Sequence, residues 1–108
     1  MKLHLNILLL ISLVFTSSLY AVEQTSTIAS EIFKGCAKCH GKDGKNAAFG
    51  RSEPLVGQEV EDLVESINFF KDSEFGKKGV ILVMSKQVNH LNEKQINELA
   101  EYISKLGR

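Results

Sequence analysis

The sequence predicts an all-α domain of three to four helices, on the basis of two observations. Apolar residues recur at helical spacing in three stretches, which cover residues 27–40, 58–71 and 92–106. Nowhere does the chain signal a pair of partner strands. Its 108 residues include 13 basic and 13 acidic side chains. We therefore expect a single small domain, a monomer, that has no nucleic-acid partner.

The first 21 residues have the features of a targeting segment. Lys2 supplies a positive start, residues 7–15 form an apolar run broken only by Ser12, and Ala21 follows small and polar residues. The apolar run is shorter than the roughly 20 residues that a membrane-spanning helix needs. We therefore expect a signal peptide over residues 1–21 whose removal leaves one domain, residues 22–108, in the periplasm. An uncleaved membrane anchor is the alternative.

A first helix is predicted from the spacing of Ile28, Ile32 and Cys36, which recur every four residues on one face. Ser26 or Thr27 can cap its start. The helix is expected to finish near the turn Cys39-His40-Gly41.

The segment Cys36-Ala37-Lys38-Cys39-His40 has the spacing of a c-type haem attachment site. Two thiols at this spacing can each add across one haem vinyl group, and His40 can then be the proximal iron ligand. A zinc site needs four ligands, and without the leader the chain offers only Cys36, Cys39, His40 and His90, with no second paired Cys or His cluster. A redox-active dithiol would need a strand–helix–strand context and would not require His40. A short-loop disulfide leaves His40 without a role. We therefore expect one covalently bound haem c, which agrees with export because c-type haem is attached outside the cytoplasm.

The middle of the chain is predicted to hold a loop and two helices. Four glycines and Pro54 indicate a loop over residues 41–57, which we expect to wrap one edge of the haem. A second helix is predicted from Gln58 to Lys71, with acidic residues near its start. Residues 80–84 form an apolar run that periodicity alone does not assign, and we expect a short helix before Met84.

The last helix has the clearest start signal. Asn92 is the expected cap, and Gln95 three residues later completes a capping box. The apolar stripe that follows consists of Ile96, Leu99, Ala100, Ile103 and Leu106. Gly107 is expected to end the helix.

From Ile28 to Leu106 the chain resembles a class I cytochrome c and is most similar to the small bacterial cytochrome c-553 group. The resemblance rests on the haem motif with Gly41, and then on Asp43-Gly44, on residues 54–58 (Pro-Leu-Val-Gly-Gln), on Met84 and on the final helix. It implies a fold wrapped around one haem, in which the first and last helices cross and Phe33 meets Tyr102. It also implies that His40 and Met84 are the axial iron ligands. The Pro54 carbonyl would accept a hydrogen bond from His40.

The residues themselves also favour Met84 as the second ligand. Without the leader it is the only methionine, and a thioether opposite histidine is the ligand pair of electron-transfer cytochromes c. Two alternatives stay open at this point. Met84 can be a core-filling side chain at the end of an apolar run, and His90 can compete for the iron.

Filled axial positions leave no place for a substrate, so we expect an electron carrier and not an enzyme. It would shuttle single electrons between the donor and acceptor complexes of a respiratory chain. Lysines near the motif and near Met84 would steer an acidic partner: Lys38, Lys42, Lys45, Lys77, Lys78 and Lys86. Ordinary solvated charges are the alternative. Two other hypotheses are a haem sensor that binds a diatomic ligand and a membrane-anchored subunit of a respiratory enzyme.

Overall fold

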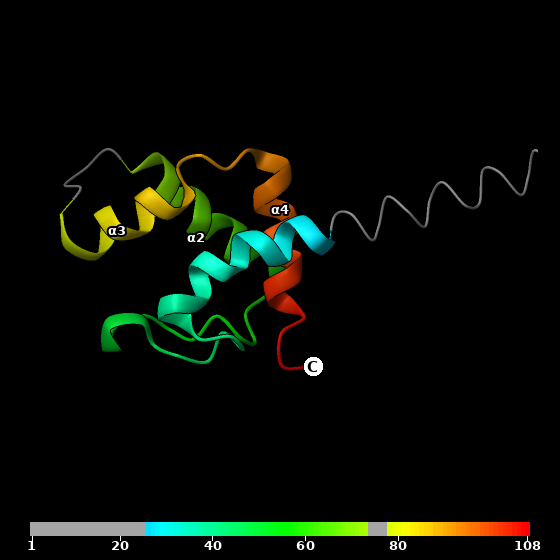
Figure 1. Ribbon diagram of the computed structural model, residues 1–108. Helices are drawn as coiled ribbons and strands as arrows, with labels where there is room; N and C mark the ends of the chain where they lie inside the picture. The colour runs from blue at the N-terminus through cyan, green and yellow to red at the C-terminus, as the bar shows by residue number, and fades with distance from the viewer. Residues whose placement is uncertain (1–25, 74–77) are drawn as a thin grey trace, which may run out of the picture.

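The computed structural model describes residues 26–73 and 78–108. These residues form four α-helices, one short 3₁₀ helix and no strand (Figure 1). The α-helices are residues 26–40, α2 (Val60–Asp72), α3 (Gly79–Val88) and α4 (Glu93–Ser104), and η1 (Ala48–Gly50) lies in the loop before α2. The all-α prediction is confirmed. The expected signal peptide over residues 1–21 lies outside the described residues, and within them no helix has the length and apolar character to cross a membrane.

The inward side of the N-terminal helix (residues 26–40) is wider than the spacing of Ile28, Ile32 and Cys36 predicts: Ile32 and Cys36 pack against the core cluster, and neighbouring positions are buried as well. Ala29, Phe33 and His40 are buried, at spacings of four and seven residues. Ile28, which we expected to face inward, is 47% exposed. The inward side therefore combines part of the predicted face with the neighbouring positions, and His40 lies on the same side as Phe33.

Two predicted helix ends differ from the structure. Ser26 and Thr27 are already helical, so neither is the cap at the start of the first helix. The last helix ends at Ser104 and not at Gly107, because the following amides donate to carbonyls three residues back and tighten the chain into a turn. Gly107 then adopts a φ of 78°. Apolar periodicity fixes the buried stripe of a helix but not its terminal residue.

The crossing of the first and last helices is confirmed at one aromatic contact. The rings of Phe33 and Tyr102 lie 5.4 Å apart between centroids, at an interplanar angle of 51°. Figure 1 shows the N-terminal helix in cyan passing across α4. Phe33 belongs to a core cluster that also contains Leu99 and Ile103, so the crossing forms one side of the hydrophobic core.

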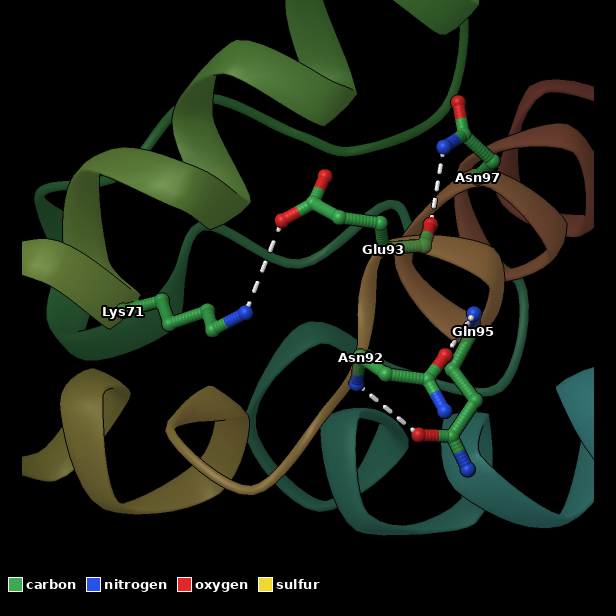
Figure 2. Close-up of polar contacts among 5 residues, drawn as sticks. All are labelled: Lys71, Asn92, Glu93, Gln95 and Asn97. Atoms are coloured by element: carbon green, nitrogen blue, oxygen red, sulfur yellow. Dashed lines mark hydrogen bonds and ion pairs between the residues drawn. The ribbon is translucent and has the colours of Figure 1, made fainter.

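The helices α2 and α3 complete the frame. α2 starts two residues later than predicted, after Glu59, and its buried residues are Leu63 and Ile67. It packs against both α3 and α4. α3 confirms the short helix expected before Met84 and continues to Val88. The end of α2 is also tied to the start of α4, because Lys71 Nζ lies 3.5 Å from Glu93 Oε1 (Figure 2).

The predicted capping box at the start of α4 is present. The Asn92 side chain accepts a 2.9 Å hydrogen bond from the Gln95 amide, and the Asn92 amide donates a 3.0 Å bond to Gln95 Oε1 (Figure 2). Each bond satisfies an amide that has no partner within the helix. The helix that begins here carries Ile96, Leu99, Ala100 and Ile103 into the core.

We expect Asn92→Ala to lower the free energy of unfolding by about 1 kcal/mol, the typical cost of losing an N-cap side chain. Chemical denaturation of the haem-loaded protein measures this loss. Asn97→Ala is the matched control, because Asn97 lies inside the same helix on its exposed side and bonds only to the Glu93 carbonyl (Figure 2). Equal losses in the two variants would show that the cap has no special role.

Candidate functional site

The N-terminal helix brings three predicted haem-binding side chains to one side of the fold. Cys36, Cys39 and His40 are spaced at i, i+3 and i+4, so they share a helix face. Gly41 follows with a φ of 81°, a left-handed conformation that favours glycine, and it ends the helix directly after His40. The Asn46 amide then donates a 3.0 Å hydrogen bond to the His40 carbonyl. The backbone of His40 is therefore held by the helix before it and the turn after it.

The loop between this helix and α2 is drawn together at Gly44. The Gly44 carbonyl accepts hydrogen bonds from the amides of Leu55, at 2.8 Å, and Val56, at 3.1 Å. Gly44 has a φ of 70°, and a Cβ there would lie 3.3 Å from the Leu55 Cβ, so the close approach favours glycine. The intervening residues form a closed loop that borders the cavity described next.

Four of the predicted site residues line a single cavity of about 350 Å³. Cys36, Cys39 and His40 reach it from the N-terminal helix, and Met84 reaches it from α3. Every helix contributes to the wall, and the apolar side chains among them are Leu63, Ile67, Phe70, Val80, Val83, Val88, Leu99 and Ile103. The volume lies within the roughly 300–1,000 Å³ that is typical of small-molecule sites. The fold therefore joins residues that are far apart in the chain into one apolar site.

His40 is prepared to bind a metal. Its side chain is buried, and neither ring nitrogen has a hydrogen-bond partner in the part of the chain that the structure describes. Desolvation by burial lowers the pKa of His40, which favours the neutral imidazole that donates a lone pair to a metal. Leaving a buried nitrogen without a hydrogen-bond partner costs about 1–3 kcal/mol of folding free energy. A ligand bound to the His40 ring would remove this cost.

The two cysteines lie in different surroundings. Cys36 is partly buried, and its Sγ lies 3.8 Å from the Ile32 carbonyl oxygen. Burial raises the pKa of the Cys36 thiol. Cys39 is exposed, and both cysteines are free thiols. Each thiol is thus available for a covalent bond to a group in the cavity.

Met84 and His90, the two candidate second ligands, occupy different places. Met84 is partly buried and lines the cavity. His90 is exposed and follows the end of α3, away from the residues that line the cavity. The arrangement favours Met84 over His90 as a ligand.

The hydrogen bond that the resemblance implies between His40 and Pro54 is not formed in the structure. Pro54 is exposed and does not line the cavity, and its carbonyl accepts a 2.7 Å bond from Gln58 Nε2. The Gln58 side chain reaches this carbonyl because residues 54–58 make a tight turn. In the same turn the backbone amide of Gln58 donates a hydrogen bond to the Leu55 carbonyl. A role for Pro54 at the haem stays a prediction.

Several cavity-lining residues were not predicted from the sequence, among them Gln58, Phe49 and Phe70. Gln58 lies in the segment that carries the family resemblance, but its bond to Pro54 has no sequence signal. Phe49 is 59% exposed and has a φ of 55°, a conformation uncommon outside glycine and often found at functional sites. Its only signal is an aromatic side chain within a glycine-rich loop. Phe70 continues the apolar stripe of α2, three residues after Ile67 and seven after Leu63, so periodicity marks it as an inward residue but does not say that it lines the cavity.

The residues around the cavity fit a haem. The apolar walls suit a large flat macrocycle, and the thiols of Cys36 and Cys39 have the spacing for attachment at the same rim as His40. His40 and Met84 would supply the nitrogen and thioether donors that haem iron takes in cytochromes c. A haem would also supply the missing partner for the buried imidazole.

Comparisons with known proteins agree with this fit. A family profile described as cytochrome c matches residues 26–107. The chain is 31% identical over 77 residues to a cytochrome c-553 of Nitratidesulfovibrio vulgaris, an overlap of 69% of this chain and 72% of the relative. A cytochrome c-553 of Desulfomicrobium norvegicum is 35% identical over 77 residues, covering 69% and 90%. A third, from Helicobacter pylori, is 30% identical over 81 residues, covering 75% and 80%.

These matches confirm the resemblance seen in the sequence, and they extend over most of the part of the chain that the structure describes. The chain belongs to the cytochrome c family of haem-bearing electron carriers.

Proposed function

We propose that this chain is a periplasmic carrier of single electrons with one haem c. The haem would be bound covalently through Cys36 and Cys39, and its iron would lie between His40 and Met84. One observation carries the proposal: these four side chains, from two helices separated by a loop and by α2, line the same apolar cavity. No single helix could present all four.

The residues at this site would have different roles in electron transfer. The haem, when bound, supplies a one-electron redox couple. His40 would hold the iron from the N-terminal helix and Met84 from α3, and with both side chains bound no coordination site would be left for a substrate. The apolar walls would exclude water from the iron. The structure would then change little between the ferric and ferrous states. This division suits a carrier and not a catalyst.

The partners would be redox proteins that donate and accept electrons. Five lysines of the predicted basic set are exposed (Lys38, Lys42, Lys45, Lys78 and Lys86), and Lys38 also lines the cavity. Lys77 lies outside the described residues. An acidic partner docked near Lys38 would lie next to the attachment site. Lys45 is partly engaged by Asp43, 3.8 Å away, so Lys38 and Lys42 are the better candidates for contact.

The experiment that tests the proposal is the mass and redox behaviour of the isolated protein. We expect the mass of residues 22–108 plus one haem that survives denaturation, and an optical redox titration that follows a one-electron Nernst curve. Haem that acidified organic solvent extracts would contradict covalent attachment. A mass that includes Met1 would contradict cleavage and favour the membrane-anchored subunit. Ready binding of carbon monoxide by the reduced protein would favour the open-site sensor.

A further inference from the structure

The exposed side of α2 has an unusual combination of charges and one aromatic ring. Asp62, Glu65, Phe69 and Asp72 are all exposed and follow one another at i, i+3, i+7 and i+10, so they form a single stripe along the helix. The opposite side of the helix carries Leu63 and Ile67 into the core against α3 and α4. The stripe, which we call the α2 acidic stripe, is thus the surface of α2 that no described element covers.

The acids of this stripe form no ion pair among the described residues, whereas four of the eight other acids there do. Glu31, Asp43, Glu93 and Glu98 each form an ion pair with a lysine. Asp62, Glu65 and Asp72 form none with any residue in the ranges 26–73 and 78–108. Within the described residues, no side chain pairs with their negative charge, and this charge could attract a cationic partner.

Phe69 lies between Glu65 and Asp72 on the stripe, and its side chain is 59% exposed. A large aromatic ring that is held on a rigid helix and surrounded by charged side chains has the composition of an interface anchor with a polar rim. Its ring also makes an edge contact with Phe70, with centroids 5.3 Å apart at 76°. Phe70 lines the cavity, so only one aromatic side chain lies between Phe69 and the candidate haem site.

We infer that the α2 acidic stripe is a docking surface for a basic redox protein. Lysine or arginine side chains of the partner would pair with Asp62, Glu65 and Asp72, while an apolar pocket of the partner would receive Phe69. The functional meaning of this surface rests on the proposed role as an electron carrier. A carrier must meet both a donor and an acceptor, and a second surface of opposite charge to the lysines would let it distinguish them.

The test uses the isotope-labelled, haem-loaded full-length protein and two redox-inert paramagnetic probes. Tris(phenanthroline)chromium(III) is cationic with an aromatic shell, like the surface expected of the partner, and hexacyanochromate(III) is anionic. We expect the cation to broaden the backbone amide signals of α2 around Glu65 and Phe69, and the broadening to weaken as salt is added. The anion should leave these signals unchanged and broaden those near Lys38 and Lys42.

Two variants and two matched controls make the result specific. Phe69→Ala and the double variant Glu65→Gln/Asp72→Asn should each weaken binding of the cation roughly 5-fold to 10-fold. Ile28→Ala removes another exposed apolar side chain, and Glu101→Gln removes another exposed acid. Neither control should change binding of the cation. All of the substituted side chains are exposed and outside the core cluster, so the four proteins should keep the fold and the haem spectrum of the wild type.

The inference is overturned if the cation broadens the whole surface evenly, or if Phe69→Ala binds it as tightly as Ile28→Ala does. Concentration-dependent signal changes at both the stripe and Lys38, without any probe, would instead identify a second copy of this chain as the occupant. Covalent haem is read independently from the spectrum. A protein that lacks haem but docks the cation refutes the proposed function, whereas a haem protein that ignores the cation refutes the stripe.

Discussion

Replacing Met84 by alanine should lower the reduction potential by on the order of 0.2 V, within the roughly 0.8 V that axial ligands span in haem proteins. Met84 lines the cavity, whereas His90, the other candidate for the second ligand, is exposed and does not line it. Sulfur is a soft donor that favours the reduced iron. Its loss removes that preference, and the potential falls.

Optical measurements separate the ligand role of Met84 from a packing role. The oxidised wild type should show the weak near-infrared band of sulfur bound to ferric iron and, when reduced, should bind carbon monoxide poorly. Met84→Ala should lose the band, bind carbon monoxide and keep its covalent haem, because Cys36, Cys39 and His40 are untouched. Met84→Leu, which restores the bulk but not the sulfur, should behave like Met84→Ala in all three respects.

His90→Ala is the control for this experiment and should keep the band, the potential and the low affinity for carbon monoxide. If the band persists in Met84→Ala and vanishes in His90→Ala, the ligand assignment is wrong. If the wild type itself lacks the band, the open-site sensor becomes the better hypothesis. The covalent attachment would stand in either case.

Replacing Phe33 by alanine should lower the free energy of unfolding by about 3–5 kcal/mol, the usual cost of deleting a buried phenylalanine ring. Phe33 is 4% exposed, packs in the core cluster and contacts the Tyr102 ring where the first and last helices cross. Its deletion would leave a cavity between the N-terminal helix and α4. Small domains have only about 5–15 kcal/mol of stability in all, so the variant should unfold at much lower denaturant concentration.

Phe69→Ala is the matched control for this substitution, because it deletes the same ring from a side chain that is 59% exposed. Its cost should be within about 0.5 kcal/mol, as for most surface substitutions. Chemical denaturation of both haem-loaded variants, followed by circular dichroism, measures the difference. Similar losses in the two proteins would show that the helix crossing does not anchor the fold.

Features that depend on neighbouring residues were predictable from the sequence. The residues Cys36, Cys39 and His40 lie close together along the chain, so their spacing predicts a haem site without knowledge of the fold. The capping box of Asn92 and Gln95 is equally local, and the structure contains both of its hydrogen bonds. The all-α class follows from helical periodicity, which is a property of contiguous segments.

Features that depend on distant contacts were less predictable. The sequence favoured Ile28 as an inward residue of the first helix, but packing against α4 placed Ala29 and Phe33 inward. Ile32 and Cys36 of the predicted face still pack partly buried against the core, so the facing helix decided how fully each apolar position is buried. The Pro54 carbonyl likewise accepts a hydrogen bond from Gln58 and not from His40, because the path of the loop places Gln58 next to it.

The sequence by itself therefore predicted the family and the helices, because each is encoded in residues close together along the chain, and the attachment motif remains a prediction with the same local basis. Only the tertiary structure brought Met84 to the cavity that holds His40, and only it set the Phe69 ring against Phe70 beside that cavity. Distances between separate helices are fixed by the packing of all the core side chains at once. No local pattern contains that information.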